Sequence, residues 1–84
     1  MIIKVLGSGC MNCKTLEKRA HEALASLGVP ADVLKVEDMV QIATYGILRT
    51  PGLVIDEKVV SFGRVPDVDE IKRMILAHST QALS

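Results

Sequence analysis

The fold is decided at residues 9–14, Gly9-Cys10-Met11-Asn12-Cys13-Lys14. This stretch follows a short apolar run, Met1 to Leu6, whose length and branched side chains are typical of a buried strand. It precedes a helical pattern in which apolar residues recur on one face: Leu16, Ala20, Ala23, Leu24 and Leu27. The two cysteines therefore lie at a strand-to-helix junction, where the free N–H groups of the first helical turn stabilise a thiolate.

The residues after this helix predict a parallel βαβ unit. The helix is expected to end at Gly28, which suits a left-handed cap, and Pro30 prevents its continuation. Residues 31–36 are then expected to form a second strand, parallel to the first because a helix connects them. Asp38 has the side chain of an N-cap and predicts a short helix from Met39 to Thr44 or Tyr45.

The second half of the chain predicts a hairpin and a last helix. Two apolar runs, residues 52–55 and 59–62, flank Asp56-Glu57-Lys58 and indicate a β-hairpin whose turn carries no glycine. Asp67 and Glu70 have capping-box spacing before a helical pattern that reaches His78. The predicted architecture is α/β, in the order βαβαββα, with a four-stranded mixed sheet flanked by helices. Residues 1–84 are expected to form a single domain in which 79–84 are a frayed tail. Met39 and Met74 are expected in the core.

Composition excludes several classes of partner. Ten basic and ten acidic residues give a formal net charge of zero. No nucleic-acid partner is expected, because a phosphate-binding surface needs a basic excess or stripe. The apolar run at the N-terminus contains Lys4 and is too short for a signal peptide or a membrane span, so no membrane partner is expected. We expect a cytoplasmic protein, and in that compartment two cysteines three residues apart indicate redox chemistry or metal binding.

The order of these elements, the Cys10-Met11-Asn12-Cys13 motif at the first helix and Thr50-Pro51 before the third strand resemble the thioredoxin fold in its smallest, glutaredoxin-like form. Residues 45–56, 58–60 and 63–65 are similar to the second half of the small redox-active disulfide proteins of bacteria and archaea, a thioredoxin-like family of about this length. The resemblance extends from Met1 to about Ala77.

The resemblance implies a dithiol–disulfide oxidoreductase that acts on protein disulfides. Cys10 is then the attacking thiol, Cys13 the resolving thiol, and Pro51 a cis proline that faces them. The backbone of Thr50 is expected to pair with an extended substrate, and Met11 and Asn12 are expected to contact it as well. No cofactor is expected, because electrons arrive from a thioredoxin-reductase-like donor or a small thiol. The protein is expected to act as a monomer.

Some positions depart from the family pattern. Met11-Asn12 is neither the Gly-Pro of thioredoxins nor the Pro-Tyr of glutaredoxins, and Gly9 stands where a Trp precedes the first cysteine. Gly7 and Lys4 lie six residues before the two cysteines, so the buried acidic proton acceptor of thioredoxins has no counterpart there.

Two alternative functions remain open. Gly9-Cys10-Met11-Asn12-Cys13 followed by a helix also resembles the first half of a heavy-metal-associated domain of the copper-chaperone type. Two thiolates bind Cu(I) there, a soft ion that favours sulfur, but that domain has the order βαββαβ and ends in a strand. The other alternative is a thioredoxin-fold adaptor without redox activity. His21 is expected to be a solvated surface residue, and Arg49 is expected near the cysteines.

Overall fold

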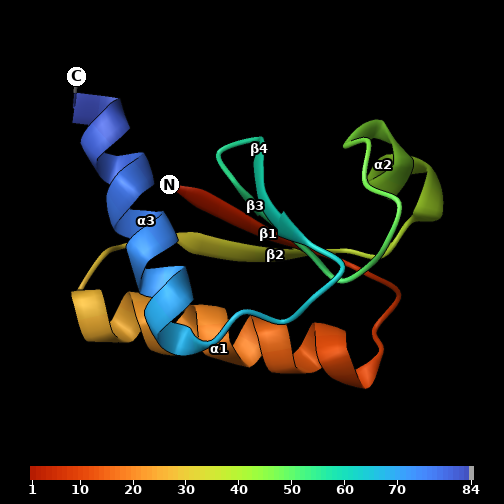
Figure 1. Ribbon diagram of the computed structural model, residues 1–84, viewed down its shortest axis with the longest axis horizontal. Helices are drawn as coiled ribbons and strands as arrows, with labels where there is room; N and C mark the ends of the chain where they lie inside the picture. The colour runs from red at the N-terminus through yellow and green to blue at the C-terminus, as the bar shows by residue number, and fades with distance from the viewer. Residues whose placement is uncertain (84) are drawn as a thin grey trace.

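The computed structural model describes the backbone of residues 1–83 and the side chains of residues 1–78 (Figure 1). Its elements are β1 (Ile2–Leu6), α1 (Met11–Leu27), β2 (Asp32–Val36), α2 (Met39–Thr44), β3 (Gly52–Ile55), β4 (Lys58–Phe62) and α3 (Val68–Leu83). The predicted order βαβαββα is confirmed. α3 continues through Leu83, and Ser84 lies outside the described residues, so the fraying expected over 79–84 stays a prediction.

The four strands form one mixed sheet in the order β2-β1-β3-β4. β1 runs parallel to β2 and antiparallel to β3, and β4 runs antiparallel to β3. Leu6, at the end of β1, is paired with Val36 at the end of β2 and with Gly52 at the start of β3. The segments that follow β1 and β2 and the segment that precedes β3 therefore meet at one end of the sheet.

Alternate side chains of β1 enter two separate apolar clusters. Ile3 and Val5 belong to the larger cluster, which includes buried residues of α1 and α3. Leu6 belongs to the smaller cluster, with Val36, Ile42 and Val54. The larger cluster lies on the face of the sheet that α1 and α3 cover, and α2 contributes to the smaller one (Figure 1). β1 therefore contributes apolar side chains to both faces of the sheet, with Ile3 and Val5 on one face and Leu6 on the other.

The two methionines expected in the core differ. Met74 on α3 packs against the larger cluster, as expected. The expectation for Met39 was wrong, because its side chain is 64% exposed. α2 has only six residues and buries only Ile42, so its first residue projects away from the sheet.

The predicted helix caps are confirmed. Gly28 ends α1 with φ 66°, in the left-handed region that glycine adopts without steric cost. Asp38 caps α2 by accepting a hydrogen bond from the N–H of Val40. The carboxylate of Asp67 accepts a hydrogen bond from the Glu70 N–H at 2.8 Å, and Glu70 accepts one from the Asp67 N–H at 3.4 Å. Local sequence thus determines where these helices begin and end.

The hairpin turn between β3 and β4 consists of Asp56 and Glu57, which have φ 46° and 69°. A two-residue hairpin turn needs positive φ at both positions, and here neither residue is glycine. Asp56 accepts the Ile2 N–H at 2.7 Å and lies 2.9 Å from His78 Nε2. The carboxylate of Glu57 pairs with the Lys4 ammonium and accepts the Tyr45 hydroxyl. Contacts from distant parts of the chain therefore hold the turn.

The outer strand β4 carries a bulge. Val54 is paired with Val59, whereas the preceding residue Leu53 is paired with Ser61, so Val60 is an extra residue on β4. Lys58 begins the strand and is exposed. The edge of the sheet is therefore neither flat nor uniformly apolar.

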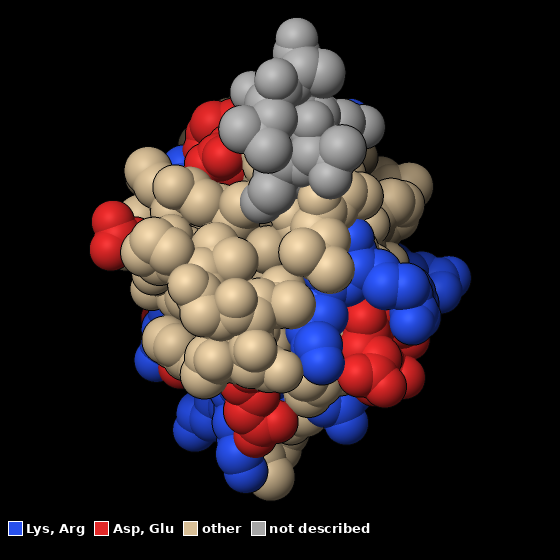
Figure 2. Space-filling view, turned by 90° about the vertical axis from the view of Figure 1, so that its left-hand side faces the viewer, with Lys and Arg blue, Asp and Glu red and all other residues tan. Residues whose placement is uncertain are grey.

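The side of the molecule away from the cysteines carries an uncharged area, with Lys and Arg interspersed among Asp and Glu around it (Figure 2). This mixture agrees with the equal numbers of basic and acidic residues in the chain. Within the described residues, no helix is long and apolar enough to cross a membrane.

The turn generates a prediction for Asp56→Asn, which removes the charge and tolerates a positive φ. The Ile2 N–H, followed by His78, holds the pKa of Asp56 below its usual value. The carboxylate therefore stabilises the fold above about pH 4, and this contribution is lost as the pH falls through the lowered pKa. We expect the variant to lose about 0.5 kcal/mol of unfolding free energy at pH 7, measured by urea denaturation. A deficit that stays undiminished near pH 2 would contradict this origin.

Candidate active site

Cys10 and Cys13 lie together at the start of α1. Cys10 is the N-cap, with extended backbone, and its carbonyl accepts the Lys14 N–H at 3.0 Å. Its thiol is exposed, whereas Cys13, in the first helical turn, is 5% exposed. The two sulfur atoms are 2.7 Å apart, and both residues are free cysteines. The structure thus places one accessible and one enclosed sulfur in direct contact.

The surroundings shift the two thiols in opposite directions. A hydrogen bond from Cys13 lowers the pKa of Cys10, and the backbone N–H groups of Cys13 and Asn12 lower it further. Burial, followed by the hydrogen bond to Cys10, raises the pKa of Cys13. Because the thiolate is the nucleophilic form of cysteine, these shifts and the exposure of its sulfur favour Cys10 over Cys13 as a nucleophile.

Gly7, directly after β1, permits the position of Cys13. A Cβ atom added to Gly7 would lie 2.2 Å from the Cys13 sulfur, closer than any non-bonded contact allows. The same Cβ would lie 3.8 Å from the Cβ of Thr50, so Thr50 is also a neighbour of this point. Gly7 is held in place by its N–H, which donates to the Val36 carbonyl at 2.9 Å.

The other predicted site residues differ in how much of their side chains is exposed. The Thr50–Pro51 peptide bond is cis, as predicted; Pro51 is buried and Thr50 is exposed. The carbonyl of Pro51 accepts the Gly63 N–H at 3.0 Å, which ties the loop before β3 to the loop after β4. Met11 and Asn12 are exposed on the first turn of α1, with 79% of Met11 accessible. Their role as substrate contacts remains a prediction.

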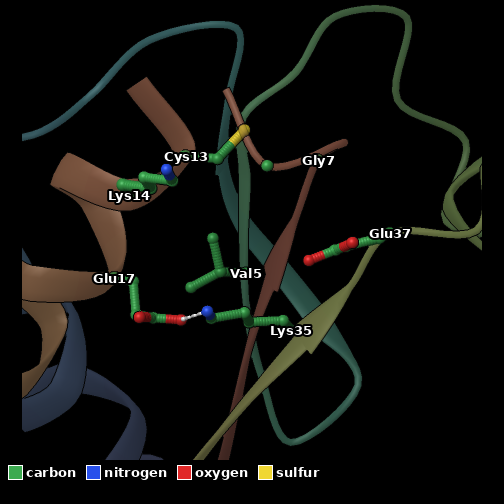
Figure 3. A pocket seen from close by; sticks show the side chains of 8 residues that line it. Val5, Gly7, Cys13, Lys14, Glu17, Lys35 and Glu37 are labelled. Atoms are coloured by element: carbon green, nitrogen blue, oxygen red, sulfur yellow. Dashed lines mark ion pairs between the residues drawn. The ribbon is translucent and has the colours of Figure 1, made fainter. Parts of the chain in front are cut away.

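A small pocket of about 60 Å³ adjoins Cys13 (Figure 3). It is lined by Val5, Gly7, Gly9, Cys13, Lys14, Glu17, Lys35 and Glu37. Glu17 and Lys35 form an ion pair at 3.4 Å across it. A buried water needs roughly 10–15 Å³ and two to four polar partners, so this space accommodates a few water molecules next to the thiol.

Glu37 is the site residue that sequence reasoning missed. It follows β2 directly, its carboxylate points into the pocket (Figure 3), and its Oε1 lies 3.9 Å from the position of a Cβ on Gly9. The missed signal was its place in the chain: β1 and β2 are parallel, so the residues after both strands lie at the same end of the sheet. His21, by contrast, is exposed, as expected.

Two kinds of comparison with known proteins, with family models and with individual relatives, agree with each other. A family model described as "Thioredoxin domain" matches residues 1–76. A protein of Methanothermobacter thermautotrophicus named "Thioredoxin" is 41% identical over 75 residues, which is 89% of this chain and 97% of the relative. Another of the same name, from Methanocaldococcus jannaschii, is 32% identical over 78 residues, which is 93% of this chain and 90% of the relative.

The contact between Gly7 and Cys13 generates a prediction for Gly7→Ala. The added methyl group collides with the Cys13 sulfur, so we expect a loss of about 1–3 kcal/mol in unfolding free energy, measured by urea denaturation. In a Cys13→Ala background the sulfur is absent, and the same substitution is expected to cost much less. An equal cost in both backgrounds would show that the sulfur is not what excludes a side chain at residue 7.

Proposed function

The chain belongs to the thioredoxin domain family, and from this premise we propose that Cys10 and Cys13 carry out its thiol–disulfide exchange with protein substrates. Thiol–disulfide oxidoreductase is the enzyme class of the protein. The observation that supports these two residues is their asymmetry: an exposed thiol of lowered pKa lies 2.7 Å from a buried thiol of raised pKa.

In the first step, the Cys10 thiolate attacks one sulfur of a substrate disulfide. The substrate S–S bond breaks, a bond forms between Cys10 and that sulfur, and the other substrate sulfur leaves as a thiolate. The position of Cys10 at the helix N-terminus favours the charged reactant. We propose that the exposed residues Met11, Asn12 and Thr50, together with the buried Pro51, form the surface against which the substrate lies.

In the second step, Cys13 loses its proton and attacks the Cys10 sulfur. The mixed disulfide breaks, the second substrate sulfur leaves as a thiolate, and the protein holds a Cys10–Cys13 disulfide. The substrate has then gained two electrons. Because the two sulfurs are already in contact, this step needs little movement of the backbone. A reductase or a small thiol returns the two electrons to the protein.

The pocket beside Cys13 provides a route for the proton of the second step. The enclosed thiol is 5% exposed, so bulk water reaches it poorly. Glu17 is engaged by Lys35, whereas Glu37 has no ion-pair partner among the described residues (Figure 3). We propose that Glu37 accepts the Cys13 proton through water in the pocket. The acid then follows β2, whereas the two positions considered in the sequence, Lys4 and Gly7, lie on β1 and directly after it.

The proposal also covers the cofactor, the compartment and the oligomeric state of the protein. Apart from the proton transfer from Cys13, every bond made or broken joins two sulfur atoms, so the proposed reaction requires no cofactor. A reducing cytoplasm suits a dithiol that must be regenerated after each cycle. We propose one monomeric domain over residues 1–84. The Cu(I) carrier gains no support, because α3 follows β4 where a copper-chaperone domain ends in a strand.

Substitution of each cysteine tests the assigned roles. Cys10→Ser is expected to abolish reduction of a disulfide substrate, because the attacking thiol is lost. Cys13→Ser is expected to accumulate a mixed disulfide at Cys10, because nothing resolves it, and intact-protein mass spectrometry measures the adduct. If Cys10→Ser accumulates a mixed disulfide at Cys13 and Cys13→Ser accumulates none, then Cys13 is the attacking thiol and Cys10 the resolving thiol.

Glu37→Gln tests the proton route. With a preformed mixed disulfide at Cys10, we expect substrate release near pH 7 to slow by about tenfold, because the carboxylate that accepts the proton is absent. Glu17→Gln is the matched control, since it alters the same pocket but removes a carboxylate already paired with Lys35. Stopped-flow measurement of release against pH gives the result. Identical pH profiles for wild type and Glu37→Gln would exclude Glu37.

A further inference from the structure

Arg49 belongs to the loop before β3, and its side chain packs against the loop after β4. It precedes Thr50 directly, and its aliphatic stem packs against the backbone of Gly63: a Cβ on Gly63 would lie 3.2 Å from Arg49 Cβ and 3.5 Å from its Cδ. Gly63 has φ 75° and donates its N–H to the Pro51 carbonyl at 3.0 Å. The missing side chain at residue 63 therefore leaves the space that the Arg49 stem occupies.

The charge of Arg49 is not neutralised within the described part of the chain. Arg49 is exposed, and no carboxylate of the described residues pairs with it. Arg64, close by in sequence to Gly63, differs because it pairs with Glu70 at 2.8 Å. Arg49 thus combines a stem held by Gly63 with a guanidinium that faces solvent. Such a group loses little side-chain freedom when it binds a carboxylate, and it offers a bidentate fork.

Glu37, the acidic residue of the pocket without an ion-pair partner among the described residues, lies across the loop after β1 from Arg49. Glu37 follows β2 and Arg49 precedes β3, and β1 lies between these two strands. The loop after β1, which contains Gly7 and leads to Cys10, therefore separates the two charges. Arg49 is the chain neighbour of Thr50, so a substrate that lies along Thr50 comes close to Arg49, on the β3 side of this loop, whereas Glu37 lies on its β2 side.

We propose that Arg49 makes this site select disulfide substrates with acidic residues next to the reacting cysteine. This inference rests on the proposed function and adds the charge class of the substrate. A substrate carboxylate placed along Thr50 pairs with the Arg49 guanidinium while Cys10 attacks the neighbouring sulfur. A basic residue in the same place meets an unneutralised like charge.

The test uses three disulfide-linked peptides that differ only in the residues flanking cysteine, which are Asp, Ala or Lys. Each peptide is reduced by the reduced protein under single-turnover conditions, and the rate constant is measured at low and high salt. For the wild type we expect the Asp peptide to react about five times faster than the Lys peptide at low salt. The ratio is expected to shrink at about 0.5 M salt, where exposed charges are screened.

Arg49→Gln is expected to reduce this ratio about threefold, because it keeps most of the stem and removes the charge. Arg49→Lys is expected to retain most of the preference. Arg73→Gln, which removes an exposed charge from α3, is the matched control and is expected to leave the ratio unchanged.

The Ala peptide separates this inference from the proposed function. If the wild type reduces the Ala peptide but shows no preference between Asp and Lys, the charge selection is wrong and the function holds. The same conclusion follows if Arg49→Gln keeps the full preference. If Cys10 reduces none of the three peptides, the proposed function fails, and the inference fails with it.

Discussion

The backbone of Gly7 lies against the sulfur of Cys13, and the rest of the site depends on this contact. Gly7 is itself fixed by its hydrogen bond to Val36, at the end of the neighbouring parallel strand. α1 can therefore begin close to the end of the sheet, with one cysteine turned inward. The other cysteine, at the N-cap, is left exposed. A side chain at residue 7 would push the start of α1 away from the end of the sheet.

Position in the fold, rather than residue type, distinguishes the two cysteines. The same thiol has a lowered pKa where the first helical turn and its neighbour donate to it, and a raised pKa where the protein encloses it. The end of the sheet provides the remaining groups. β1 leads to the cysteines, β2 leads to Glu37, and β3 begins after Thr50 and Pro51. Neighbouring strands thus bring together residues that lie far apart in the chain.

The sequence predicts those features that neighbouring residues determine. The βαβ unit, the left-handed end at Gly28 and the cap at Asp38 each depend on a few adjacent side chains, and the structure confirms them. The conformation of Asp56 and Glu57 was not predictable in this way, because Ile2, Lys4 and His78 hold the turn from distant positions. Glu37 was missed for the same reason: its proximity to Cys13 comes from strand pairing and not from a motif.

The bulge at Val60 has a consequence for how copies of the protein meet one another. β4 is an outer strand, and a regular outer strand offers its unpaired backbone groups as a template for another chain. The extra residue breaks that template in its middle, and the exposed charge of Lys58 disfavours a second copy at its start. At this edge of the sheet, the bulge and the Lys58 charge therefore disfavour the addition of a strand from a second copy of the protein.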